Sequence, residues 1–267
     1  MWQSAGRIRY RKIRLEDGCL KADDAYEVIS PFSNPNLPFD FAKVDDLKSA
    51  LKFELRYAPL NYDSLLDYDL LFENLEKRKG GDPVKWVLEH ACFVRFALDL
   101  IYALAYENGR DALSLFHKFV VYKDYSDPAL RGTGDFKYPR GAKIATTMVP
   151  APKSESDTLW AIPHVIAILV NANTKNIHQE LMISSRGRIM SVQMYQALIE
   201  AIWSMVGNLA MKAQQEGERI YFNRCEWCNS VFIAKDKRQR FCPPIIGKES
   251  LCGLKFRQRK CQANKGR

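Results

Sequence analysis

Residues 224–242 read RCEWCNSVFIAKDKRQRFC, and this stretch determines how the C-terminal part of the chain folds. Its first two cysteines, Cys225 and Cys228, are separated by two residues. At this spacing a tight backbone turn, or knuckle, brings two thiolates to one tetrahedral metal ion. The third, Cys242, follows after thirteen further residues. The stretch therefore predicts a small module built around a metal ion, and zinc is the ion that such sites usually hold.

The residues between Cys228 and Cys242 predict a β-hairpin. The apolar run at 230–234 is typical of a short strand, and the charged residues 235–238 are typical of a turn. We expect residues 239–241 to form the returning strand that brings Cys242 to the knuckle. A knuckle, a hairpin and a third ligand in this order predict a zinc ribbon or a treble-clef-like module.

The fourth ligand is either Cys252 or Cys261. Cys252 is the better candidate because residues 254–262 predict a helix, and free N–H groups at a helix N-terminus stabilise a thiolate. Cys261 would lie far along this helix. No histidine follows His178, so the site is predicted to be all-cysteine, closed to water and structural. A module this small depends on its metal to fold, with about 10–16 kcal/mol of apparent binding free energy.

The positive charge of the chain is concentrated in the same region. The whole chain has 40 Lys and Arg residues against 31 Asp and Glu residues, a formal net charge of +9. Residues 212–267 hold 14 of these cations and 5 of the acids, so they account for the entire excess. A local positive field favours a polyanion, most simply nucleic acid. Seven basic residues of the module are predicted to bind it: Lys237, Arg238, Arg240, Lys255, Arg257, Arg259 and Lys260.

Two of these features also have simpler interpretations. A basic tail often serves only as a solvated face, or it binds an acidic protein. Trp227 of the knuckle can stack on a base, but an aromatic residue in such a turn more often packs against the core of its own module.

Residues 1–215 are predicted to form a mainly helical α+β domain, and residues 216–267 the zinc module. With 47% hydrophobic residues in the whole chain, the larger region is expected to bury a proper core. Asp82 and Pro83 are predicted to open its central helix, which ends before Asn108-Gly109. Its expected elements are a hairpin at 7–30, an irregular connection at 31–38, helices at 41–57, 84–105 and 192–215, a loop-rich segment at 122–163, a strand at 165–170 and a second hairpin at 179–191.

Several classes of protein do not fit the sequence. No apolar run approaches the ~18–20 residues of a membrane span, and the first residues lack the apolar region of a secretory signal. Seven cysteines, an odd number with four at metal-ligand spacing, indicate reduced thiols and hence a cytoplasmic protein. No common hydrolase or nucleotide-binding motif is present, and the histidines are isolated. The sequence therefore predicts a binding protein and not an enzyme.

Four segments together resemble the bacterial CGNR-type zinc-finger proteins. They are LIEAIW at 198–203, GER at 217–219, RCEWCNSVF at 224–232 and RQRFC at 238–242. The resemblance implies an apolar helix that leads into a four-cysteine finger ending in a basic helix. It also implies an N-terminal region of the ABATE type and a role as a stress-induced transcription regulator.

The sequence departs from this family in two places. The Cys-Gly-Asn-Arg pattern is Cys-Gly-Leu-Lys at 252–255, so the Asn-Arg pair is lost and Lys255 alone keeps the cation. The interval between Cys242 and Cys252 is also longer than the resemblance implies, and it contains Pro243-Pro244. The metal ligands therefore carry over, whereas a DNA-reading role for the missing pair does not.

Together these observations predict a cytoplasmic regulator that binds one structural Zn²⁺ and nucleic acid, DNA in preference to RNA, without a membrane. Its N-terminal domain is expected to sense a ligand or to form a homodimer. The alternative is an interaction adaptor whose zinc module docks an acidic protein partner.

Overall fold

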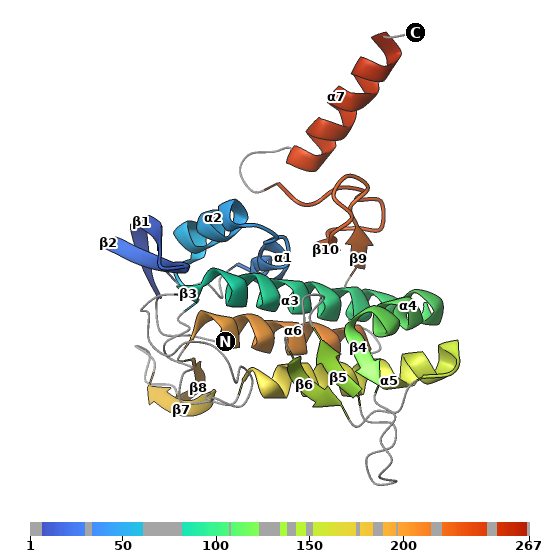
Figure 1. Cartoon of the computed structure of the whole chain (residues 1–267), viewed down its shortest axis with the longest axis horizontal. Helices are drawn as coiled ribbons and strands as arrows, with labels where there is room; N and C mark the ends of the chain where they lie inside the picture. The colour runs from blue at the N-terminus through green and yellow to red at the C-terminus, as the bar shows by residue number, and fades with distance from the viewer. Residues whose placement is uncertain are drawn as a thin grey trace.

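The computed structural model describes residues 7–29, 34–60, 82–106, 108–122, 134–137, 143–147, 152–174, 177–183, 189–195, 197–214, 221–244 and 250–265. Within these residues the chain is mainly helical with short strands, which confirms the predicted α+β class (Figure 1). The helices are α1 (Leu37–Phe41), α2 (Leu47–Tyr57), α3 (Val84–Ala105), α4 (Gly109–Phe119), α5 (Glu155–Ala172), α6 (Leu198–Gln214) and α7 (Leu251–Lys265).

The strands form four small antiparallel sheets, ordered β1-β2-β3, β4-β5-β6, β7-β8 and β10-β9. They are β1 (Arg7–Glu16), β2 (Cys19–Ile29), β3 (Asp82–Pro83), β4 (Val120–Tyr122), β5 (Gly134–Lys137), β6 (Lys143–Thr147), β7 (His178–Ile183), β8 (Ile189–Met194), β9 (Tyr221–Arg224) and β10 (Val231–Ala234). We call α1–α6 the helical body, and residues 221–265 the finger.

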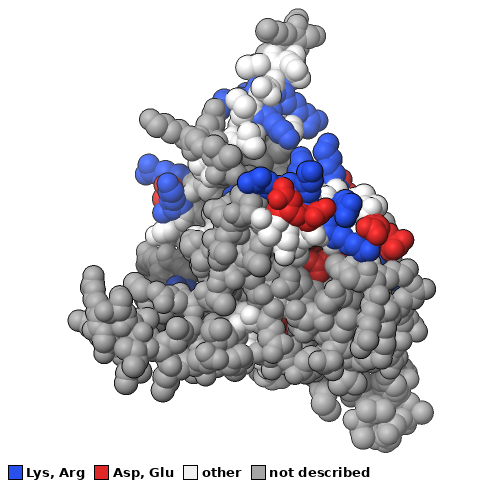
Figure 2. Space-filling model, turned by 90° about the vertical axis from the view of Figure 1, so that its left-hand side faces the viewer, with Lys and Arg blue, Asp and Glu red and all other residues white. Residues whose placement is uncertain are grey.

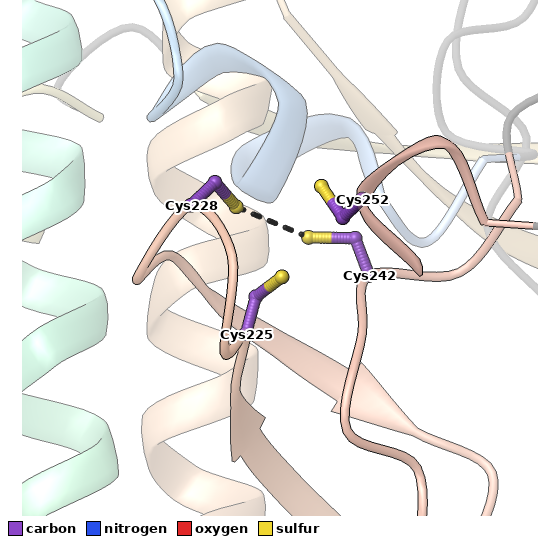
Figure 3. Close-up of side chains that lie close together, drawn as sticks. All are labelled: Cys225, Cys228, Cys242 and Cys252. Carbon is purple, nitrogen blue, oxygen red and sulfur yellow. Dashed lines mark hydrogen bonds between the residues drawn. The ribbon is translucent and has the colours of Figure 1, made fainter. Parts of the chain in front are cut away.

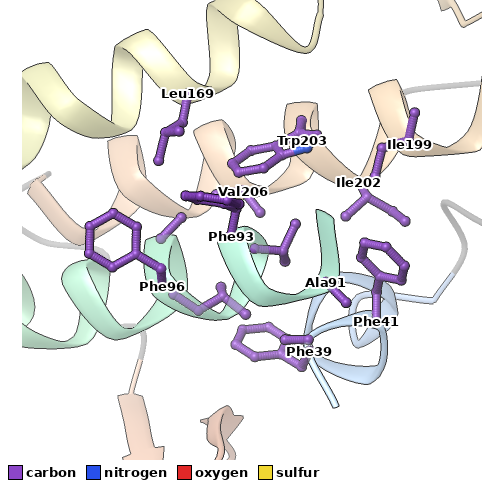
Figure 4. Close-up of a cluster of buried hydrophobic side chains, with 14 of the residues drawn as sticks. Phe39, Phe41, Ala91, Phe93, Phe96, Leu169, Ile199, Ile202, Trp203 and Val206 are labelled. Carbon is purple, nitrogen blue, oxygen red and sulfur yellow. The ribbon is translucent and has the colours of Figure 1, made fainter. Parts of the chain in front are cut away.

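The core of the helical body is centred on α3, which packs against α4, α5 and α6. Apolar residues occupy most of the circumference of α3, so it buries side chains toward several neighbours at once. Phe93 and Phe96 of α3 lie against Trp203 of α6 and Leu169 of α5, and all four are fully buried (Figure 4). Burial of each such side chain contributes about 1.5–3 kcal/mol before entropic costs. No helix in the described part of the chain combines the length and the apolarity that crossing a membrane requires.

Both predicted hairpins are present. β1 and β2 meet at the turn formed by Asp17 and Gly18, which both adopt positive φ. β7 pairs with β8, although the turn expected near residue 186 lies outside the described residues. The helix predicted to begin at residue 192 starts instead at Leu198, because β8 continues to Met194.

The helix predicted over residues 41–57 is wrong in its first part. Phe41 ends the short helix α1, and α2 begins only at Leu47. The stop between them is local: Asp46 accepts a hydrogen bond from the Ser49 backbone, and the Ser49 side chain accepts one from the Asp46 backbone. This reciprocal cap fixes the start of α2.

The central helix also begins and ends differently from the prediction. Pro83, and not Asp82, is its N-cap, because Asp82 pairs with Leu20 in the β2–β3 ladder. Gly109 does not follow α3 as a stop but opens α4. A Cβ atom at Gly109 would lie 2.5 Å from the carbonyl oxygen of Glu155, so the close approach of α5 requires glycine there.

The strand predicted at 165–170 and the last part of the loop predicted up to residue 163 are both wrong, because α5 covers these residues. Pro163 lies inside this helix, where it removes a backbone hydrogen bond at a cost of about 3 kcal/mol. Ile162, Val165, Ile166 and Leu169 are nevertheless buried on one side of the helix, and their packing outweighs that cost. A short apolar run cannot by itself distinguish a buried helix from a strand.

Candidate metal centre

The knuckle is the turn that joins β9 to β10. Arg224, the last residue of β9, pairs with Val231, the first of β10. Within the turn, the Cys225 amide donates to the Ser230 carbonyl at 3.0 Å and the Asn229 amide donates to the Cys225 carbonyl at 2.9 Å. Asn229 adopts a φ of +58°, a left-handed conformation that asparagine tolerates better than most residues. These constraints turn the chain back and aim both knuckle thiols to one side.

The returning strand predicted at 239–241 is absent, and β10 pairs with β9 instead. Side-chain bonds to the backbone hold this segment in its place. The Asn223 amide group donates to the Gln239 carbonyl at 2.7 Å, and the Gln239 side-chain oxygen accepts from the Lys235 amide at 2.9 Å. The segment therefore still delivers Cys242 to the knuckle, without a β-ladder.

Four cysteine sulfurs converge at this point (Figure 3). The Sγ atoms of Cys225, Cys228, Cys242 and Cys252 all lie within 4.8 Å of one another, and those of Cys228 and Cys242 are 3.5 Å apart. Four ligands at 2.3 Å around a tetrahedral ion would have sulfurs ~3.8 Å apart. A disulfide would need about 2.05 Å, so the four residues are free thiols in a metal-ligand arrangement.

Cys252 joins the group from the first turn of α7. Ser250 precedes the helix, and its carbonyl accepts the first helical bond from the Leu254 amide at 3.0 Å. Gly253 allows this turn to approach Phe241, because a Cβ atom there would lie only 3.3 Å from the Phe241 ring. Cys261 is exposed farther along α7 and is not part of the cysteine group.

Without a cation, interactions among the thiols shift the pKa values of Cys228, Cys242 and Cys252 in different directions. The hydrogen bond with Cys242 lowers the pKa of Cys228 to about 4 and raises the pKa of Cys242. Burial, followed by the charges of Cys228 and Cys225, raises the pKa of Cys252 to about 12. Negative charge on one sulfur thus opposes ionisation of the next. A divalent cation removes this conflict, so the donor set fits a structural metal ion held by four thiolates.

The finger is anchored on the helical body through β9 and β10. Phe222 and Val231 are buried in the main core of the protein. The Tyr106 hydroxyl donates to the Phe222 carbonyl at 2.5 Å. Arg224 forms an ion pair with Asp99 of α3 at 2.9 Å, and its guanidinium lies 5.0 Å from the centre of the Tyr102 ring.

Sequence reasoning missed this anchor because its partners lie more than 100 residues apart. It also missed Lys43, which follows α1 in the helical body and contributes positive charge beside the cysteines. Burial alone would lower the pKa of Lys43, but the charges of Cys242 and Asp40 raise it overall. Lys43 and Pro243 line a cavity of about 120 Å³ between the body and the finger.

The predicted phosphate-binding residues fall into two groups. The first lies on the loop after β10, where Arg240 forms an ion pair with Glu226 and Lys237 lies over the Tyr221 ring at 5.9 Å. Arg238 is also exposed there. The second group lies on α7, where the basic side chains are exposed: Lys255, Arg257, Arg259 and Lys260.

α7 carries no acidic residue along its whole length, and it extends away from the helical body (Figure 1). Figure 2 views the side of the molecule that carries β1 and β2 in Figure 1, and it shows Lys and Arg side chains over the upper half of that face, with Asp and Glu side chains among them. The four-cysteine group thus lies at the base of a basic helix that projects from the molecule.

No protein-family model, no curated protein and no solved structure matches the chain.

Proposed function

We propose that the chain binds one structural Zn²⁺ through Cys225, Cys228, Cys242 and Cys252, and that the basic surface of its finger binds DNA in a regulatory role. The observation that carries the proposal is the position of α7, whose N-terminal turn supplies a cysteine to the metal group while the rest of the helix presents cations and no acid. The resemblance to CGNR-type regulators supports the same role.

Zinc is proposed over other metals because of the donor set. Four thiolates in a near-tetrahedral arrangement suit zinc, and hard cations such as Mg²⁺ and Ca²⁺ prefer oxygen ligands. All four positions would be filled by protein, so the ion would have a structural role. Its contribution would be to join the knuckle, the loop after β10 and the start of α7, segments that share little apolar surface.

Nucleic acid is proposed as the partner because the cations are grouped and free of acidic neighbours on their own helix. Lys255 and Arg259 are four residues apart and share one face of α7, with Arg257 and Lys260 beside them. Each phosphate that a cation neutralises on a duplex releases a counterion, so about six contacts would give a salt slope of roughly −5. The ion pair of Arg240 with Glu226 makes Arg240 a weaker contributor than the α7 residues.

The proposal is tested by a mobility-shift titration of the zinc-loaded protein with a duplex of mixed sequence, from about 50 mM salt upward. The variant with Lys255, Arg257, Arg259 and Lys260 all changed to Ala is expected to lose most of its affinity. Its salt slope should become shallower by about 0.9 for every phosphate contact removed.

A matched control removes four exposed cations from the helical body: Lys48, Lys52, Arg110 and Lys118. It changes the net charge equally, so an effect confined to the α7 variant assigns binding to that helix. If the zinc-loaded wild type binds neither DNA nor RNA at about 50 mM salt, the nucleic-acid role is wrong, and binding of an acidic protein becomes the better explanation.

A further inference from the structure

A groove runs between the knuckle and α7. It has a volume of about 350 Å³ and is lined by Glu226, Trp227, Phe256, Arg259, Lys260 and Ala263. Its volume lies at the lower end of the range of small-ligand sites. The groove is distinct from the four-cysteine group, none of whose members lines it.

Two aromatic side chains line the groove, and both are held by the finger itself. Trp227 is half-buried and packs against the small apolar cluster of the finger. Phe256 is also half-buried, with its ring centre 5.2 Å from that of Phe241 and the Arg240 guanidinium 5.9 Å away. The rings are therefore positioned before any ligand binds, which reduces the entropic cost of stacking against them.

The charge at the rim is positive. Arg259 and Lys260 are exposed at one edge, and the only acidic lining residue, Glu226, is neutralised by its ion pair with Arg240. An aromatic wall beside two cations is the combination that binds a planar base and its neighbouring phosphates. An acidic peptide would satisfy the cations but would not use the two ring faces.

We infer that this groove takes an unpaired nucleobase, so that the finger binds single-stranded DNA more tightly than its phosphate contacts alone would allow. The inference rests on the proposed function and assigns to it a substrate class. A base in a duplex is stacked on both faces and cannot enter the groove without unpairing. The basic face of α7 would contact phosphates on any strand, whereas the groove would respond only to the presence of bases.

The test compares three probes of equal length with the zinc-loaded protein: a twelve-residue oligothymidine, the same backbone made of abasic residues, and a duplex. Trp227→Ala is expected to weaken binding of oligothymidine by about 5- to 150-fold, the effect of removing one base–aromatic stack. Binding of the abasic strand should change less than about two-fold, because its phosphate contacts are intact. Trp227→Phe should retain most of the affinity for oligothymidine.

Trp160→Ala is the matched control, since Trp160 is 59% exposed on α5 and takes no part in the finger. Zinc content shows that each variant keeps its finger. Quenching of tryptophan emission by oligothymidine provides a second readout, which should persist in Trp160→Ala and disappear in Trp227→Phe.

If oligothymidine and the abasic strand bind equally and Trp227→Ala changes neither, the groove does not take a base, while the proposed function stands. If no probe binds at all, the proposed function fails with the inference. If Trp227 emission changes with protein concentration and not with DNA, the groove is a contact between copies of the chain, and the inference is likewise overturned.

Discussion

The helical body and the finger are stabilised in different ways. The body buries a continuous set of aromatic and aliphatic side chains around α3, with Phe93 and Trp203 fully buried. Among the described residues, the separate apolar cluster of the finger has four buried members, and two of these, Cys225 and Cys242, are metal-ligand candidates. The body can therefore fold through apolar burial, whereas the outer part of the finger depends on its cysteines.

Within the finger, one part is stabilised by the core of the body and the other part by the cysteines. β9 and β10 contribute Phe222 and Val231 to the core of the body, so these two strands are stabilised by apolar burial. The knuckle, the loop after β10 and α7 have no such support in the described part of the chain. We therefore expect loss of the metal and loss of the core to be separable events, and each of the following changes should affect one more than the other.

The largest effect is expected from a metal-ligand change. Cys225→Ser or Cys242→Ser should abolish binding of about one zinc per chain, because three thiolates cannot fill a closed tetrahedral site. Up to about 10–16 kcal/mol of binding free energy is at stake, yet most of the helical signal should remain, since it comes from α1–α6. Metal analysis and far-ultraviolet circular dichroism measure the two quantities on the same sample.

The two candidates for the fourth ligand, Cys252 and Cys261, provide a matched pair. Cys252→Ser should lose zinc as the other ligand variants do, and Cys261→Ser should keep it, because Cys261 lies exposed outside the cysteine group. The reverse result would show that α7 turns back to present Cys261, and the ligand set derived from the spacing would be wrong.

A change in the core should produce the opposite pattern. Phe93→Ala removes a fully buried ring from the centre of the body and should cost about 3–5 kcal/mol of unfolding free energy. Urea unfolding followed by circular dichroism gives this value. Zinc content at low urea should stay at the level of the wild type. Simultaneous loss of metal and helix in this variant would show that the body and the outer finger unfold together.

The sequence was most informative where the physical cause is local. The Cys225–Cys228 spacing, the apolar strand before Lys235 and the helix that begins near Cys252 were all predicted, because each depends on neighbouring residues. The period of apolar residues likewise predicted α3 and the C-terminal end of α6, although the predicted start of α6 was six residues too early.

The features that failed are those in which distant packing decides. Pro163 indicates a helix break locally, but α5 continues through it because its apolar face is covered by α4 and α6. The anchor of the finger joins Asp99 to Arg224, and no pattern in the sequence relates the two. The charge of Lys43 lies near the cysteines for the same reason, because α1 packs against α3 and α6.

A smaller effect is expected at the anchor between the two regions. Arg224→Ala removes the partner of Asp99, which is 17% exposed and whose pKa burial already raises. The half-buried ion pair and the contact with Tyr102 together should be worth about 2 kcal/mol. A double-mutant cycle with Asp99→Asn, measured by urea unfolding, isolates the pair. If the coupling energy is near zero, the ion pair does not hold the finger on the body, and the burial of Phe222 and Val231 with the Tyr106 hydrogen bond does.

The smallest effect, and the one with the most distinctive pH dependence, is expected at Glu54 of α2, which is fully buried in the body. Burial, followed by the charge of Asp82, raises the pKa of Glu54 well above its ordinary value. The unfolded chain therefore releases this proton at a lower pH than the folded one, and stability that is present near pH 4.5 is lost as the pH rises.

Glu54→Gln should remove this loss, so its unfolding free energy should exceed that of the wild type by about 1 kcal/mol or more at pH 7.5 and by progressively less toward pH 5. Glu155→Gln, exposed at the start of α5, is the control, because it makes the same change at the surface. Zinc binding at the proposed metal centre should have the opposite dependence, because it requires thiolates and strengthens as the pH rises. If Glu54→Gln instead destabilises the protein equally at every pH, Glu54 acts only through its shape in the core, and the body lacks the pH dependence expected of it.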